Sequence, residues 1–156
     1  MPAAKIQHDR ASVLARARRE YAALDALIGG LTAGAWTWRV PRTDSHDPWT
    51  VKDAIVHIVH WKEHTARVLR VERRPPELRR LDAHAVNHLI YERWRDRPIA
   101  EVVAWHHAVH EDVVRTLETI PEERIGGRIH STEWPLDFDG HSADHGRRDI
   151  EAALGR

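Results

Sequence analysis

The sequence predicts an all-α protein built as a single four-helix bundle. Four long segments carry apolar residues at steps of three and four, the spacing of one face of an α-helix. Prolines separate these segments, at positions 41, 48, 75, 76, 98, 121 and 135. No segment shows the sustained two-residue alternation of a half-buried strand. One bundle is the simplest arrangement that buries four such faces.

The first predicted helix runs from about residue 9 to residue 28. Its apolar face is formed by Val13, Ala17, Tyr21, Leu24 and Ile28. The pair Gly29-Gly30 then ends it, because glycine is the usual residue just past a helix C-terminus. Residues 32–47 mix Gly, Pro, Thr, Asp and Ser, which predicts a turn and a loop anchored by two tryptophans, Trp36 and Trp38.

The second predicted helix begins after Thr50 and ends near residue 71. The Thr50 hydroxyl can cap the first turn, and Asp53 stands three positions on, as a capping box requires. Its predicted apolar stripe consists of Ala54, Ile58, Trp61 and Val68. Residues 72–80, with Pro75-Pro76 and four arginines, are expected to form a solvated connection.

An extra short helix is predicted at residues 81–95, in the connection between the second and third long helices. Pro98 is placed to begin the third, because proline is favoured in the first turn. This helix has the clearest apolar face of all, formed by Val102, His106, Val109, Val113, Leu117 and Ile120. The last helix is predicted over residues 137–154.

Composition narrows the classes of function. A chain of 156 residues predicts one domain, 1–156, with residues 1–8 as an N-terminal tail. Equal numbers of basic and acidic residues, 24 each, argue against nucleic acid as a partner. No cysteine is present, so disulfides, thiolate metal sites and cysteine nucleophiles are excluded. No apolar run reaches about 18 residues and no signal peptide is apparent, so we expect a cytoplasmic protein without membrane contact.

The chain holds 13 histidines, and their spacing points to metal binding. Residues four apart lie on one helical face, so they can offer two ligands to one ion while a facing helix supplies a third. Three sets have this spacing: His60 with His64, His106 with His110, and the series His141, His145 and Asp149. Such pairs also arise by chance in a chain this rich in histidine.

The expected direction of each side chain separates these candidates. On the last helix Ala143, Gly146, Ile150 and Ala153 mark the core side, which places Asp149 within it, His145 at its margin and His141 further round. On the second helix His57 lies beside the apolar stripe and is expected to face the core. The other histidines considered are expected in solvent or at interfaces: His60, His64, His84, His88, His106, His107, His110 and His130.

Two motifs resemble one protein family. The segment PWTVKDAIVH at 48–57, with Trp61 a turn later, is similar to the second-helix signature of the DinB/YfiT-like metal-binding four-helix bundles. The segment DHGRRDIE at 144–151 resembles the last-helix H-x-x-x-H segment of that superfamily. The stretches 86–88, 91–93, 96–98 and 120–123 resemble its ClbS/DfsB branch. The resemblance extends from about Tyr21 to Leu154.

The resemblance implies an up-down-down-up bundle holding a divalent metal, most often Zn or Ni. His57 and His145 match two of the three ligand positions. Asp149 stands where the family more usually has a histidine; a carboxylate can replace it as a zinc ligand. In a register shifted by one turn, His141 and His145 supply the pair and Asp149 lies outside the coordination shell. The resemblance further implies a homodimer.

Trp61 and Trp49 are candidates for the wall of a substrate pocket beside this metal. Indoles at helix starts and along apolar stripes are usually core residues, so both interpretations stay open. His57 has an equally plain alternative, as a buried histidine bonded to a carbonyl or water. For Asp149 the alternative is a surface ion pair with Arg147 or Arg148.

Three functions follow as hypotheses. In the first, the metal activates water or a low-molecular-weight thiol cosubstrate for attack on an electrophilic small molecule, in detoxification or stress resistance. In the second, a metal-independent ClbS-like hydrolase confers resistance to a reactive natural product. In the third, a pocket in the bundle binds and sequesters a small molecule without turnover.

Overall fold

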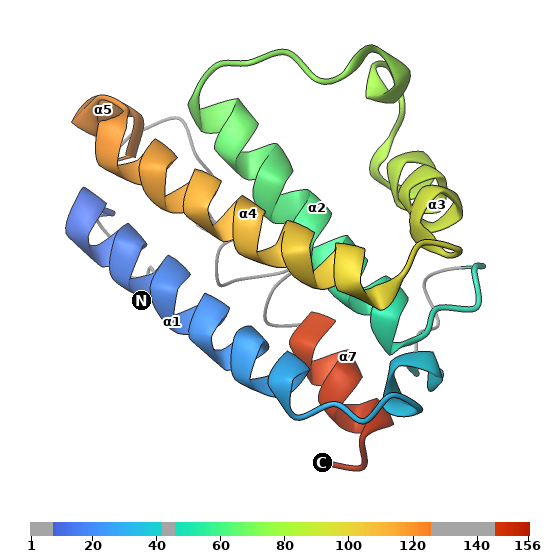
Figure 1. Cartoon of the computed structure of the whole chain (residues 1–156). Helices are drawn as coiled ribbons and strands as arrows, with labels where there is room; N and C mark the ends of the chain where they lie inside the picture. The colour runs from blue at the N-terminus through green and yellow to red at the C-terminus, as the bar shows by residue number, and fades with distance from the viewer. Residues whose placement is uncertain (1–7, 42–45, 126–145) are drawn as a thin grey trace, which may run out of the picture.

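A computed structural model of the chain describes residues 8–41, 46–125 and 146–156, and within them the long regular elements are helical (Figure 1). The helices are α1 (Arg10–Gly29), α2 (Val51–Leu69), α3 (Ala83–Trp94), α4 (Ile99–Thr119), α5 (Glu122–Ile125) and α7 (Gly146–Ala153), with short 3-10 turns η1 (Ala35–Thr37) and η2 (Pro76–Leu78). The described ranges contain no strand, only one isolated bridge between Arg39 and Thr50, so the all-α class is confirmed. None of the described helices is long and apolar enough to cross a membrane.

The helix boundaries agree with the local signals in the sequence. Thr50 and Asp53 form the predicted capping box at the start of α2, where the Thr50 backbone N–H donates to Asp53 Oδ2 over 2.8 Å. α1 ends at Gly29 as predicted. The short helix expected between the second and third long helices is present as α3, capped by Asp82. Of the predicted last helix, 146–153 forms α7 and 137–145 lies outside the described residues.

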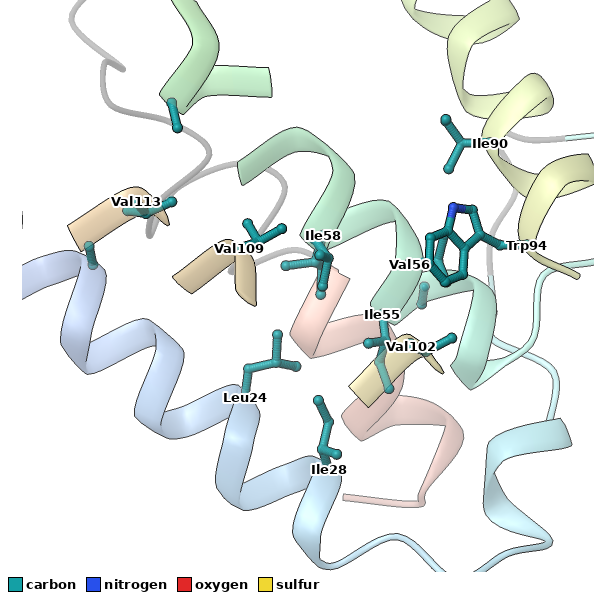
Figure 2. Packing of buried hydrophobic residues seen from close by; sticks show 14 of the residues in the cluster. Leu24, Ile28, Ile55, Val56, Ile58, Ile90, Trp94, Val102, Val109 and Val113 are labelled. Carbon is teal, nitrogen blue, oxygen red and sulfur yellow. The ribbon is translucent and has the colours of Figure 1, made fainter. Parts of the chain in front are cut away.

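α2 is the central helix of the described structure. It packs against α3, α4 and α7, while α1 packs against α4 on the far side of α4 from α3 (Figure 1). Figure 2 shows Ile55, Val56 and Ile58 of α2 among apolar side chains from the surrounding helices. Because it has neighbours on three sides, α2 buries far more of its surface than one apolar stripe.

This central position overturns two expectations about α2. His60, expected in solvent, is buried at 6% exposure. Val68, assigned to the apolar stripe, is 49% exposed, although its neighbour Leu69 is buried at 3%. A single apolar stripe is typical of a helix that buries only one side, whereas α2 is covered on several sides.

A buried polar group lies on the α2 side opposite His60. Lys62 is only 6% exposed, and its electrostatic neighbours are Glu20 of α1 and Arg147 of α7. Arg147 Nε and Nη2 donate to the two Glu20 carboxylate oxygens over 2.8 and 3.1 Å, which joins α1 to α7. Burial lowers the pKa of Lys62 to about 8 even though the Glu20 charge opposes the change. The ammonium is therefore held at an energetic cost to the fold.

The start of α1 is fastened to the far end of α4. Arg10 Nη2 donates to the carbonyl of Ile120 over 2.7 Å, and Arg10 Nε pairs with Glu122 Oε2 at 3.0 Å. The Arg10 backbone N–H donates to the same Glu122 carboxylate. One arginine thus satisfies a free carbonyl beyond α4 and holds α5 against α1.

α7 approaches α2 through a residue without a side chain. A Cβ built on Gly146 would lie 2.7 Å from Cγ1 and 2.9 Å from Cδ1 of Ile58, which is itself fully buried. Glycine is thus the residue that fits where α7 begins.

We therefore expect Gly146→Ala to lower the free energy of unfolding by about 1–3 kcal/mol, because an added methyl group overpacks the contact with Ile58. Urea unfolding followed by circular dichroism measures the change. Gly34→Ala is the matched control, since a Cβ at Gly34 meets no atom within 4 Å. A Gly146→Ala protein as stable as the Gly34→Ala protein would contradict this close contact.

Lys62→Met is expected to raise the free energy of unfolding at pH 7 by about 1–3 kcal/mol, because it removes a buried charge and keeps a long apolar side chain. The folded-state pKa of about 8 lies below the ordinary 10.5, so between these values the unfolded chain binds more protons. Wild-type stability should accordingly rise with pH across this window, and the variant should lack the rise.

Urea unfolding at pH 7.5 and pH 10 tests both parts. Lys52→Met is the control, because Lys52 donates from the surface to the carbonyls of Arg95 and Arg97 and should leave the rise unchanged. An equal rise with pH in wild-type and Lys62→Met proteins would sink the interpretation.

Candidate metal centre

Five polar side chains gather where α1 packs against α4. Tyr21 and Asp25 lie one turn apart on α1, and His106, His107 and His110 lie on α4. Tyr21 and Asp25 are four residues apart, and so are His106 and His110, while His107 is three residues before His110, so the members from each helix lie on neighbouring turns. The two helices contribute to one cluster because they pack side by side (Figure 1).

Three of these side chains converge to metal-binding distances. His106 Nε2 lies 3.2 Å from Asp25 Oδ1, and His107 Nδ1 lies 3.8 Å from the same oxygen. One ligand atom from each of Asp25, His106 and His107 lies within 4.8 Å of the other two. Within the described ranges, this is the group of three His, Asp or Glu side chains that converges this closely.

This donor set fits a divalent transition metal. Bonds of about 2.1 Å from a tetrahedral ion place neighbouring ligand atoms roughly 3.4 Å apart, between the 3.2 and 3.8 Å observed here. Two imidazoles and a carboxylate are borderline and hard donors that suit zinc, nickel and iron. Three protein ligands leave a coordination position for a small molecule, as catalytic zinc sites do.

The electrostatic environment keeps the buried imidazoles neutral. Burial lowers the pKa of His106 to about 4, and the nearby Lys62 charge lowers it further while Asp25 opposes the change. The pKa of His110 is also lowered to about 4, first by burial and then by Lys62. A neutral imidazole has a free lone pair, so His106 can bind a metal ion at neutral pH without first losing a proton.

The cluster is buried on one side and open on the other. The His106 side chain is 1% exposed, whereas those of Asp25 and His107 are 44% and 48% exposed. An ion can therefore arrive from solvent and bind against a fixed inner ligand. Sequence reasoning placed His106 and His107 in solvent, and for the buried His106 that expectation is wrong.

Tyr21 closes the cluster on the α1 side. Its hydroxyl forms a hydrogen bond with His107 Nδ1 over 2.6 Å. Its ring stacks on His110 with centroids 3.5 Å apart and planes within 4°. The Tyr21 pKa is raised, mainly by burial and then by the charges of Asp25 and Glu111.

The ligands predicted from the sequence lie elsewhere or outside the described residues. His57 is on the side of α2 that faces α3, away from Lys62 and the α1–α4 cluster. Asp149 is partly buried on α7. His145 and His141 fall in the range that is not described, so the predicted set of His57, His145 and Asp149 stays a prediction.

A small cavity does lie beside His57, between α2 and α3. Its volume of about 10 Å³ is the room that one water molecule needs. The lining side chains are Trp49, Asp53, Val56, His57, His60, Asn87, Ile90 and Tyr91. Trp49 is thus a wall residue of this cavity, at 3% exposure. Trp61 packs behind the wall, where its Nε1 donates to Asn87 Oδ1 over 2.8 Å.

Sequence reasoning missed Asp25 altogether. His106 carried a signal, because it shares the apolar face of its helix with Val102 and Val109, both of which are buried. A histidine on such a face is a candidate for an inward-pointing ligand. The pairing with Asp25, 81 residues away, carries no local signal.

Comparison with known proteins gives one match. A family model described as the DinB superfamily matches residues 16–146. No curated protein matches the chain, and no solved structure matches it.

Proposed function

The chain belongs to the DinB superfamily, and we propose that it binds a divalent metal through Asp25, His106 and His107 and uses it on an electrophilic small molecule. The nucleophile would be water or a low-molecular-weight thiol, and the biological role detoxification or stress resistance. A thiol must come from a cosubstrate, because the chain has no cysteine. Zinc and nickel are the metals we consider first.

The observation that carries this proposal is the convergence of three ligand atoms from two helices. Asp25 Oδ1 is shared between His106 Nε2 at 3.2 Å and His107 Nδ1 at 3.8 Å. A divalent metal bound there would supply Lewis acidity, lowering the pKa of a coordinated nucleophile toward neutrality.

The protein's own residues fix the position of the metal ion and set the electrostatic field around it. His106 is fixed inside the bundle and neutral, so it provides a rigid inner donor. Asp25 contributes the negative charge that attracts a cation, and its exposed side leaves space for a substrate. Lys62, buried behind His106, opposes the binding of a cation and favours an anionic nucleophile near the centre.

A second arrangement is the one that the sequence motifs imply. In it His57 and His145 hold the metal with Asp149 or His141, and Trp49 and Trp61 shape the pocket. The cavity beside His57 favours this arrangement as an alternative location for the same chemistry. Metal-free ClbS-like hydrolysis and sequestration without turnover are the alternatives in which no metal is needed.

Metal content of protein purified without a polyhistidine tag tests the location. We expect about one zinc or nickel ion per chain by elemental analysis, and at least about 100-fold weaker binding in Asp25→Asn and His107→Ala. Both side chains are half-exposed, so both variants should fold. His84→Ala, an exposed histidine on α3, is the control and should bind normally.

The other outcomes identify the alternatives. Binding lost in His57→Ala but kept in Asp25→Asn and His107→Ala moves the site to the second arrangement. Wild-type protein that binds no zinc or nickel refutes the metal proposal. In that case, turnover in the presence of chelator would indicate the hydrolase, and protection limited to one molecule per chain would indicate sequestration.

A further inference from the structure

The Tyr21 hydroxyl lies at hydrogen-bonding distance from one of the metal-binding atoms. Its oxygen is 2.6 Å from His107 Nδ1, the same nitrogen that lies 3.8 Å from Asp25 Oδ1. Tyr21 precedes Asp25 by one helical turn, so the two oxygen donors of α1 face the two imidazoles of α4 together. The phenol oxygen thus adjoins the nitrogen with which His107 would bind an ion.

Packing holds this phenol in place. Its ring is stacked on His110 with centroids 3.5 Å apart, and on His106 with centroids 4.8 Å apart and planes 24° apart. The His107 ring lies edge-on to the Tyr21 ring, with centroids 6.2 Å apart. Three imidazoles from two successive turns of α4 therefore restrict the tyrosine, and its oxygen is presented to the centre without further ordering.

We propose that Tyr21 is the fourth protein ligand of this metal centre. The ion takes the place of the hydroxyl proton of Tyr21, and that proton is released to solvent. The completed donor set is one phenolate, one carboxylate and two imidazoles. The inference rests on the metal site of the proposed function, and adds a phenolic donor to its two imidazoles and its carboxylate.

The fourth donor changes what the centre can do. Phenolate and carboxylate together carry two negative charges, which balance a divalent cation at a half-exposed site. Four protein ligands fill the coordination of a tetrahedral zinc ion. A substrate or thiol must then displace Tyr21 or enlarge the coordination number, so Tyr21 controls the access of a substrate to the ion.

Copper(II) is the spectroscopic probe for this ligand, because phenolate bound to copper(II) gives a ligand-to-metal charge-transfer absorption band. We expect this band in the copper-loaded wild-type protein and its loss in Tyr21→Phe, which keeps the ring and its stacking. Zinc affinity should fall about tenfold or more in Tyr21→Phe. Tyr91→Phe is the matched control, since the chain has two tyrosines and Tyr91 lies at the α2–α3 cavity.

The result that would overturn the inference is a charge-transfer band that persists in Tyr21→Phe, or zinc affinity equal to that of the wild type. Metal binding that depends on Asp25 and His107 without any such band also overturns it, and leaves the proposed centre standing. A wild-type protein that binds neither ion removes the centre itself and Tyr21 with it. Loss of the band in Tyr91→Phe would show that the copper-bound phenolate comes from Tyr91 of α3, and would contradict the proposal.

Discussion

Burial of α2 on three sides is the constraint on which the rest of the structure depends. Its contacts with α3, α4 and α7 leave little of its surface to solvent, so polar residues on it must find partners inside the protein. The Lys62 ammonium is attracted by the Glu20 carboxylate, and His60 faces the α2–α3 cavity. Burial, and after it the charge of Lys62, lower the pKa of His106 and keep it neutral, which links the packing of α2 to the chemistry on α4.

Features that depend on neighbouring residues could be predicted from the sequence, whereas contacts between distant residues could not. The capping box of Thr50 and Asp53 is encoded within four residues, and it was predicted correctly. The burial of His60 was not, because it depends on how many helices surround α2 rather than on the pattern within α2. Likewise, nothing near Asp25 in the sequence indicates that α4 supplies its partners. The bundle's chain order and the last-helix ligands remain predictions.

The α1–α4 centre and the α2–α3 cavity divide the chain's polar residues into two regions with different properties. The centre combines a buried imidazole with half-exposed donors, so it is accessible and has fixed geometry. The cavity has room for about one water molecule, so a larger ligand requires α2 and α3 to separate. The two lie on different sides of α2, and a substrate bound at one does not touch the other.

The contacts of Arg10 have a consequence for synthesis on the ribosome. This residue bonds to Ile120 and Glu122, which follow it by 110 and 112 positions, and Glu20 meets Arg147 127 positions later. α1 therefore leaves the ribosome more than 100 residues before these partners. Leu24 and Ile28 of nascent α1 therefore stay exposed to solvent until these partners are made. Docking of α1 is a late step of folding, and a chaperone can shield the exposed apolar side chains before it.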